Sequence, residues 1–358
     1  METVLVTGVA GNLGTRLLPH LAGYDIVGVD FVEPRAGSPM RFERMDLGHE
    51  ASCADLVSLL LDTQTVAVLH LAFVIDPVRT GVLDVDRMWQ INVAGTARVL
   101  EAISEANRRG GSVRKFLFPS SVSAYGPDLP EPVREDAPLA GHTLPYAIHK
   151  READEVVRQR AASLAPCRTY ILRPHIFVGA SMQNYLVGSL RGTPTGKSRR
   201  AERLRARGVR LPMMLPMGLH YRQNLYQFVH VDDMARLLAY IVRRQDSGPR
   251  VTVLNVASRG APVSLERCAE IAHARIQQVP TRALCRFILK LVWDLGISAF
   301  PPEAFPYLAG QYLMDTTALQ RFLGADYEQV MQHTVEEAVT DSFRTLEAPQ
   351  LAQPATAS

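Results

Sequence analysis

The sequence predicts an α/β protein with a doubly wound parallel sheet and a smaller C-terminal lobe. Over the first 120 residues, short β-branched apolar runs alternate with segments of helical spacing. The strand-like runs are apolar throughout, as in parallel strands that helices cover on both faces. With 358 residues, 47% hydrophobic and 21% charged, the chain has a globular composition and the length of two domains or one large one.

The expected elements alternate along the chain. The strand-like runs are residues 3–7, 25–29, 66–72, 113–118, 167–172 and 251–256. The helical segments between the first five are residues 12–22, 54–61, 85–107 and 146–162. Pro19 falls inside the first helical segment and removes an amide donor, which predicts a kink or an early end there.

The second half of the chain is less regular. The periodic pattern breaks down between residues 181 and 224, and a strand and a helix follow over 227–242. Beyond 258 the chain looks helical with proline breaks. We expect a nucleotide-binding domain of residues 1–176 with 225–258, a substrate lobe of residues 177–224 and 259–346, and a disordered tail of residues 347–358.

Composition excludes several classes of protein. The net charge is only +3, unlike that of a nucleic-acid-binding polycation. The four cysteines stand far apart without a C-x-x-C pair, which excludes a disulfide framework or a recognisable zinc site and fits a reducing cytosol. The chain opens directly into a strand-like segment without a signal peptide, and its longest near-apolar run, residues 66–75, is too short to span a bilayer. We expect a cytoplasmic protein without metal or transmembrane segment.

A glycine-rich turn connects the first strand to the first helical segment. Its sequence is GVAGNLG. Gly8 permits the tight turn, Gly11 lets the backbone approach a pyrophosphate, and Gly14 lets the helix pack closely on the strand. Asn12 and Leu13 begin the helix, whose amide groups face the anion. The G-x-x-G-x-x-G spacing differs from the commonest fingerprint, but its place between strand and helix favours dinucleotide binding in a Rossmann fold.

Asp30 ends the second strand and indicates which dinucleotide is bound. A carboxylate there accepts hydrogen bonds from the adenosine ribose hydroxyls and repels a 2′-phosphate, which favours NAD over NADP. An Asp at a strand end also commonly caps a turn. Arg35, five residues later, could pair with a 2′-phosphate if the loop folds back.

A tyrosine and a lysine predict acid–base chemistry. Tyr146 and Lys150 are four residues apart near a helix start, so they share one face. A free tyrosine has a pKa near 10, and we expect the lysine cation and a positively charged nicotinamide to lower the pKa of Tyr146. Ser121, at the end of an earlier strand, could hydrogen-bond the reacting oxygen.

Together these motifs resemble the extended short-chain dehydrogenases/reductases of the NAD-dependent epimerase/dehydratase family, which include UDP-glucose 4-epimerase-like members. The resemblance covers about residues 3–260. Further motifs that carry it are Asp46-Leu47, His70-Leu71-Ala72, NVAGT from Asn92, SSVSAYG from Ser120, Arg173-Pro174 and FVHVDD from Phe228.

The resemblance implies a role for each matching residue. Tyr146 would be the general acid/base, Lys150 would lower its pKa and hold the nicotinamide ribose, and Ser121 would orient the substrate oxygen. The other implied cofactor contacts are Asp46 and Leu47 at the adenine, Leu71 and Ala72 along the cofactor, Asn92 below the nicotinamide end, and His175. The His230 to Asp233 stretch would be structural. A homodimer through helices near 85–107 and 146–162 is also implied.

The reaction implied is hydride transfer at a secondary alcohol or ketone carbon, with a nucleotide sugar as one candidate substrate. Some positions depart from that pattern. Ile176 replaces an Asn that usually meets the substrate diphosphate, Tyr226 replaces an Arg, and Phe73 replaces a small residue. The alternatives are therefore a dehydrogenase or reductase of a hydrophobic, steroid- or lipid-like alcohol, and a non-catalytic nucleotide-sensing protein.

Two segments of the second half are unusual. Residues 191–210 contain eight basic residues and one Glu, so they carry +7 while the rest of the chain carries −4. A solvated flexible insertion is the simplest interpretation; contact with a phosphate, a coenzyme-A tail, an acidic partner, nucleic acid or a membrane surface is the alternative. Residues 281–300 combine a wide apolar surface with a basic edge, which favours a helix packed on the lobe, or else a membrane interface or a greasy pocket wall.

Overall fold

The fold is built on one parallel sheet of seven strands. The computed structural model describes residues 1–34, 40–75, 81–82, 84–180, 182–245 and 248–344. The strand order is β12-β7-β5-β4-β1-β2-β3, and every neighbouring pair is parallel. The strands are β1 Thr3–Thr7, β2 Asp25–Asp30, β3 Arg41–Arg44, β4 Thr65–His70, β5 Lys115–Pro119, β7 Arg168–Pro174 and β12 Val251–Val256. The predicted doubly wound α/β class is confirmed.

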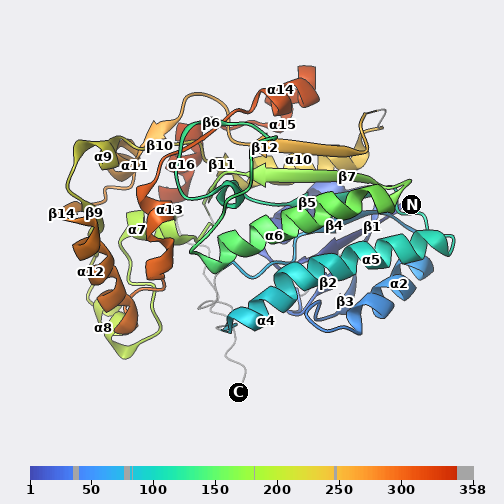
Figure 1. Cartoon of the computed structure of the whole chain (residues 1–358), viewed down its shortest axis with the longest axis horizontal. Coiled ribbons are helices and arrows are strands. Elements are labelled where there is room, and N and C mark those ends of the chain that lie inside the picture. Colours follow the sequence, from blue (N-terminus) through green and yellow to red (C-terminus); the bar gives the residue numbers. More distant parts are fainter. Residues whose placement is uncertain (35–39, 76–80, 83, 181, 246–247, 345–358) are drawn as a thin grey trace.

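Helices cover both faces of this sheet (Figure 1). One layer holds α1 Asn12–Leu17 and α10 Val231–Arg243; the other holds α2 Ser52–Thr63, α5 Gly95–Arg108 and α6 Pro145–Arg160. Strand β1, which is buried from Val4 to Thr7, shows why both layers are needed. Val4 and Val6 pack into the first layer, and Leu5 packs into the second, because successive strand side chains point to opposite faces.

The first helices show how local chemistry sets element ends. α1 ends at Leu17, and a 3₁₀ turn, Leu18–Leu21, contains Pro19, so the predicted early end is confirmed. The helix expected over 85–107 is divided into α4 Val85–Trp89, a π-helical turn Gln90–Ala94 and α5. Such π turns are often found at functional sites.

The smaller lobe lies beyond the carboxyl ends of the strands (Figure 1). It has its own core, formed by residues such as Leu186, Leu215 and Phe305. Its helices are α7 Tyr185–Arg191, α8 Arg199–Ala206, α9 Leu219–Gln223, α11 Leu265–Ile271, α12 Arg282–Asp294, α13 Phe305–Ala309 and α16 Val335–Phe343. Its short strands are β8 Phe177–Val178, β9 Met213–Pro216, β10 Leu225–Tyr226, β11 Val229–His230, β13 Val263–Ser264, β14 Ile276–Val279 and β15 Tyr312–Met314, which pairs with β6 Leu129–Val133.

The structure departs from expectation in this lobe. The segment without a readable pattern, 181–224, contains helices and the strand β9 in its described part, and the basic segment forms α8 rather than a flexible loop. The segment that forms strand β14 was expected to be helical. It is a strand because it pairs in parallel with β9 over four residues. Leu319 of α14 Thr317–Leu323 and Val330 of α15 Tyr327–Val330 pack against the sheet domain, although the sequence assigned them to the lobe.

Two further expectations concern membrane-spanning helices and the C-terminal tail. Among the described residues, the helices are all too short or too polar to cross a membrane. The tail expected over 347–358 lies outside the described residues.

Candidate active site

The glycine turn folds as a narrow cradle between β1 and α1. Gly8 has a φ of +71°, and a Cβ there would lie 2.5 Å from the amide nitrogen of Ala72. A Cβ on Gly14 would lie 2.6 Å from the carbonyl oxygens of Gly8 and Val9. Side chains at either position would therefore displace backbone. The first-turn amides that follow Gly11 have no carbonyl within the helix to pair with, so they can meet an anion.

Asp30 fastens this turn to the end of β2. Its carboxylate accepts hydrogen bonds from the amide of Ala10 at 2.9 Å and from the amide of Val32 at 3.1 Å. The side chain is partly exposed beside the turn, where it can still accept from ribose hydroxyls because each carboxylate oxygen has two acceptor sites. Asp30 can therefore cap the turn and accept from a ribose at the same time, so the two interpretations made from the sequence are compatible with each other. Arg35 lies outside the described residues.

Replacing Asp30 with Ala should weaken NAD binding about 10- to 100-fold, because hydrogen bonds to a charged acceptor are lost. NADP binding should fall less, since the carboxylate also repels its 2′-phosphate. Calorimetric titration of both nucleotides measures the two effects. Asp25→Ala at the other end of β2, where Asp25 pairs with the N-terminus at 3.7 Å, is the matched control. An unchanged affinity for NAD in D30A would remove Asp30 from the cofactor site.

Leu71 and Ala72 follow β4 directly above the turn. The amide of Leu71 donates to the carbonyl of Thr7 at 3.1 Å, and the Thr7 hydroxyl accepts from the amide of Ala72 at 3.3 Å. His70, just before them, lies between the hydroxyls of Thr7 and Thr96 at 2.8 and 3.0 Å, and burial lowers its pKa to about 3. His70 is therefore a neutral structural bridge that fixes the floor of the site.

Asn92 lies in the π turn and is fully buried. Its side-chain oxygen accepts from the amide of Val74 at 2.6 Å, and its side-chain nitrogen donates to the carbonyl of Val74 at 3.0 Å and lies 3.3 Å from Nδ1 of His149. The amide group is thus fully used in holding the segment that follows β4. The structure supports a positioning role for Asn92, while the direct cofactor contact stays a prediction.

Tyr146 and Ser121 meet at the carboxyl end of the sheet. Tyr146 is in the first turn of α6, and Ser121 precedes the 3₁₀ turn Val122–Tyr125 that follows β5. Burial raises the pKa of Tyr146 to about 12, and its hydrogen bond with Ser121 acts in the opposite direction. Burial therefore outweighs the hydrogen bond, and the lowering expected from Lys150 and a nicotinamide cation stays a prediction.

Lys150 lies one turn further along α6 and is buried. Its Nζ donates to the carbonyl of Pro119 at 2.7 Å and lies 3.6 Å from the centre of the Phe73 ring. Burial lowers its pKa to about 7, although the Asp154 carboxylate acts to raise it. The Phe73 ring also meets the Tyr146 ring edge to face, with centroids 5.9 Å apart. Phe73 thus covers the tyrosine and lysine together, a contact that the sequence did not reveal.

A buried ion pair holds α6 against the sheet. Arg173, at the end of β7, makes two hydrogen bonds of 2.9 Å to Asp154, and both side chains have no exposed surface. Arg173 also donates to the hydroxyl of Tyr125 at 2.7 Å and to the carbonyl of Glu135 at 2.8 Å. Sequence reasoning missed Asp154, although its spacing of four from Lys150 places it on the same helix face.

The remaining implied cofactor residues have protein partners. Asp46 accepts from the amide of Gly48 at 2.9 Å and pairs with Arg87. Leu47 is buried next to it. His175 is buried, its ring nitrogens lie 2.7 and 3.2 Å from the amides of Ile176 and Gln227, and burial lowers its pKa to about 3. Their contacts with a cofactor stay predictions.

The donor set fits a dinucleotide. The glycine cradle, the acceptor Asp30 and the backbone that follows β4 lie at the carboxyl ends of the neighbouring strands β1, β2 and β4. This is where a parallel sheet binds a pyrophosphate and an adenosine ribose. The buried hydroxyl of Ser120, next to Ser121, has no hydrogen-bond partner among the described residues. Tyr146 and Lys150 lie on α6, and the Lys150 ammonium contacts the carbonyl of Pro119 at the end of β5.

The described residues contain one group that could ligate a metal, formed by His230, Asp233 and His333. Its polar atoms are already used. His333 Nδ1 lies 2.8 Å from Asp233, which also pairs with Arg236. His230 caps α10 by accepting from the amide of Asp232 at 3.1 Å. These contacts support the structural role expected for this strand-to-helix turn.

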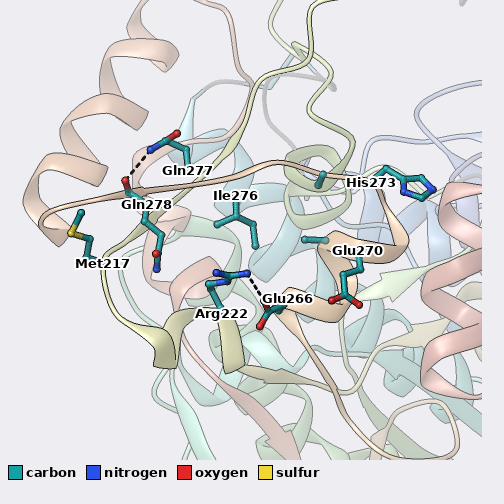
Figure 2. Close-up of a pocket in the computed structure, with 10 residues that line it drawn as sticks. Met217, Arg222, Glu266, Glu270, His273, Ile276, Gln277 and Gln278 are labelled. Carbon is teal, nitrogen blue, oxygen red and sulfur yellow. Dashed lines mark hydrogen bonds and ion pairs between the residues drawn. The ribbon is translucent and has the colours of Figure 1, made fainter.

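A surface cavity of about 760 Å³ lies in the lobe, and its lining includes none of the candidate cofactor or catalytic residues (Figure 2). Its lining comes from residues 217–278, and the ion pair between Arg222 and Glu266 crosses its wall. Gln277 and Gln278 of β14 and Met217 face it from the other side (Figure 2).

Comparisons with known proteins agree with this geometry. The family model described as NAD dependent epimerase/dehydratase family matches residues 4–257. A UDP-glucose 4-epimerase of Erwinia amylovora is 30% identical over 205 residues, covering 54% of this chain and 58% of that protein. One of Streptomyces lividans is 32% identical over 165 residues, covering 44% and 47%. The chain thus matches about half the length of these relatives.

Solved structures share the fold along nearly the whole chain. The UDP-glucuronic acid 4-epimerase of Bacillus cereus, in complex with UDP-glucuronic acid and NAD, has a TM-score of 0.65 at 17% identity and covers 96% of this chain and 98% of its own. The UDP-Glc/GlcNAc 4-epimerase of Campylobacter jejuni has a TM-score of 0.65 at 20% identity with the same coverage. Since the family model spans well over half of the sequence, the chain belongs to the NAD dependent epimerase/dehydratase family.

Proposed function

We propose that the protein is an NAD-dependent epimerase that inverts a secondary alcohol carbon of a nucleotide sugar, with Tyr146 as acid/base. The observation that carries this proposal is the joint placement of Ser121, Tyr146 and Lys150 at the α6 end of the glycine cradle. The matched UDP-glucose 4-epimerases support the substrate class. A protein that only senses nucleotide has no need of an acid/base.

The chain's own residues would divide the work of the reaction. NAD, when bound, supplies the hydride acceptor and donor. Tyr146 takes the hydroxyl proton from the substrate and later returns it, and Ser121 holds the same oxygen. Lys150, in its protonated form, carries the positive charge that favours the phenolate form of Tyr146. Phe73 excludes water from both groups, and this strengthens their interaction.

A second candidate, a dehydrogenase or reductase of a hydrophobic alcohol, is favoured by Tyr226. Its hydroxyl lies 2.7 and 3.0 Å from the carbonyl oxygens of Leu308 and Gly310, to which its single hydrogen can be donated, inside an aromatic cluster that includes Phe228. This buried tyrosine offers nothing to a diphosphate. Ile176 likewise has no polar side chain to offer a diphosphate, and both residues would favour a more apolar substrate than a sugar nucleotide.

Release of the bound nucleotide distinguishes the two candidates. We expect the protein, purified without added cofactor and then denatured, to release close to one equivalent of NAD, measured by mass spectrometry and absorbance. An epimerase returns the hydride within one turnover, so it can keep its cofactor. Incubation with UDP-glucose, UDP-glucuronic acid and UDP-N-acetylglucosamine should then yield a C4 epimer without net NADH. Empty protein that forms free NADH with apolar alcohols would favour the second candidate.

The assembly and location are part of the same proposal. A homodimer would pair α4 and α5 with α6 of each copy, where the half-exposed Val85 and the partly exposed Trp89 lie. A cytoplasmic location agrees with the cysteines, all of which are free thiols in the described chain.

A further inference from the structure

The outer face of α12 leaves large apolar side chains in solvent. Of the 13 residues of this helix, only Cys285 is buried. Leu284, Phe287 and Leu291 share one stripe and are 40%, 64% and 47% exposed. Their spacing of three and four residues places them on one side of the helix. Such a run of exposed apolar residues marks a contact surface rather than a random feature of the exterior.

Basic groups flank this stripe. Arg282, Arg286 and Lys290 recur every four residues on α12 and are exposed. Lys290 pairs with Asp294 at 2.6 Å, which leaves two of the three without an acidic partner among the described residues. The arrangement is that of an interfacial helix, with an apolar side and a cationic edge.

A second basic element adjoins the end of α12. The amides of Gly196 and Ser198 donate to the carbonyls of Ile297 and Gly296 at 2.9 and 3.2 Å, so the start of α8 is attached to the end of α12. Both helices lie at one end of the lobe, at the lower left of Figure 1. The exposed cations of this basic arm are Lys197, Arg199, Arg200, Arg203, Arg205, Arg207 and Arg210.

The basic arm stands out because its charges are uncompensated. Within the described residues none of its seven exposed cations forms an ion pair, whereas some exposed arginines elsewhere, such as Arg267 with Glu336, do. The only acidic side chain in the arm is Glu202. Charge and apolar surface are therefore concentrated on one tip of a chain whose remainder is net negative.

We propose that this tip, the α12 stripe with the basic arm, docks the protein reversibly on an anionic lipid membrane. A lipid surface offers both things that the tip needs, acyl chains for Phe287 and anionic headgroups for the arginines. With 13 residues α12 is about 20 Å long, shorter than the roughly 30 Å of a bilayer core, so it lies along the surface.

Other occupants fit the tip less well. A second copy meeting the same face across a two-fold axis would bring two uncompensated basic arms together. Nucleic acid would neutralise the arginines but would leave Leu284 and Leu291 in water, because phosphates and bases do not bury aliphatic side chains.

Vesicle flotation with the full chain tests the proposal. Vesicles of phosphatidylcholine with about 30% phosphatidylglycerol should bind the protein at least about tenfold more tightly than pure phosphatidylcholine, and binding should weaken when salt rises from about 50 to about 500 mM. Phe287→Ser/Leu291→Ser and Arg199→Glu/Arg203→Glu should each reduce binding to anionic vesicles at least about tenfold.

Matched controls separate docking from general surface effects. Leu219→Ser, at a residue 62% exposed on α9, and Arg250→Glu/Arg321→Glu, on the sheet domain, should bind like the wild type. Absence of binding to anionic vesicles overturns the proposal. Retained vesicle binding in F287S/L291S also overturns it. So does binding of an RNA duplex as tight as that of anionic vesicles, if that binding depends only on the arginines. A change of oligomeric state in F287S/L291S without any change in flotation would point to a second copy of the chain instead and would likewise overturn it.

Discussion

Tyr146→Phe should reduce kcat by about a thousandfold or more while NAD binding changes by less than about threefold. The substitution removes only the hydroxyl that the substrate proton must reach, because the ring keeps its edge contact with Phe73. The measurement is turnover of the substrate identified in the nucleotide-sugar assay, together with calorimetric titration of NAD.

Tyr240→Phe is the control for Y146F. Tyr240 is a partly exposed tyrosine of α10, whose hydroxyl donates to Asp326 at 2.9 Å, on the far side of the sheet domain. Its loss should leave turnover within about twofold of the wild type, as is usual for substitutions away from a site. Undiminished turnover in Y146F would end the proposed acid/base role and would shift attention to Lys150, whose pKa of about 7 also suits proton transfer.

Arg173→Met should lower the free energy of unfolding by about 3–5 kcal/mol. It leaves Asp154 buried without its cation and removes the donor to the Tyr125 hydroxyl. Since Asp154 is on α6 one turn beyond Lys150, the surviving folded protein should also lose activity. Denaturant unfolding followed by tryptophan fluorescence and far-UV circular dichroism gives the change in stability.

The double substitution Arg173→Met/Asp154→Leu should recover most of this loss. Burying two apolar side chains costs less than burying one unpaired charge, so the ion pair is retained for geometry more than for stability. Arg267→Met, which breaks the exposed contact with Glu336 at 2.5 Å, should cost less than about 1 kcal/mol. An equal loss of unfolding free energy in R267M and R173M would show that burial does not set the cost of breaking an ion pair in this protein.

Much of the sheet domain could be predicted because its determinants are local. The apolar run Thr3–Thr7, the glycines after it and the helical spacing from Asn12 each dictate a conformation within a few residues. Pro19 ends the first helix by the absence of its own amide hydrogen. The same holds for Tyr146 and Lys150, since a spacing of four on a helix places two side chains on one face.

The lobe could not be predicted in the same way. Strands β9 and β14 are four residues each, carry no alternation that distinguishes them, and exist because Met213–Pro216 and Ile276–Val279 pair across sixty residues of chain. The basic segment gave no sign that Ser198 would cap a helix and attach it to α12.

The sequence by itself determined the fold class, the glycine cradle and the identity of the groups that the resemblance assigned to catalysis. Only the tertiary structure decided how far these groups are buried and which partners they contact. It partly buries Tyr146, and this desolvation raises the pKa to about 12; it also covers Lys150 with Phe73 and closes Arg173 onto Asp154. The physical reason is that a residue's type and spacing are local, whereas its desolvation and its partners depend on chain segments far away in the sequence.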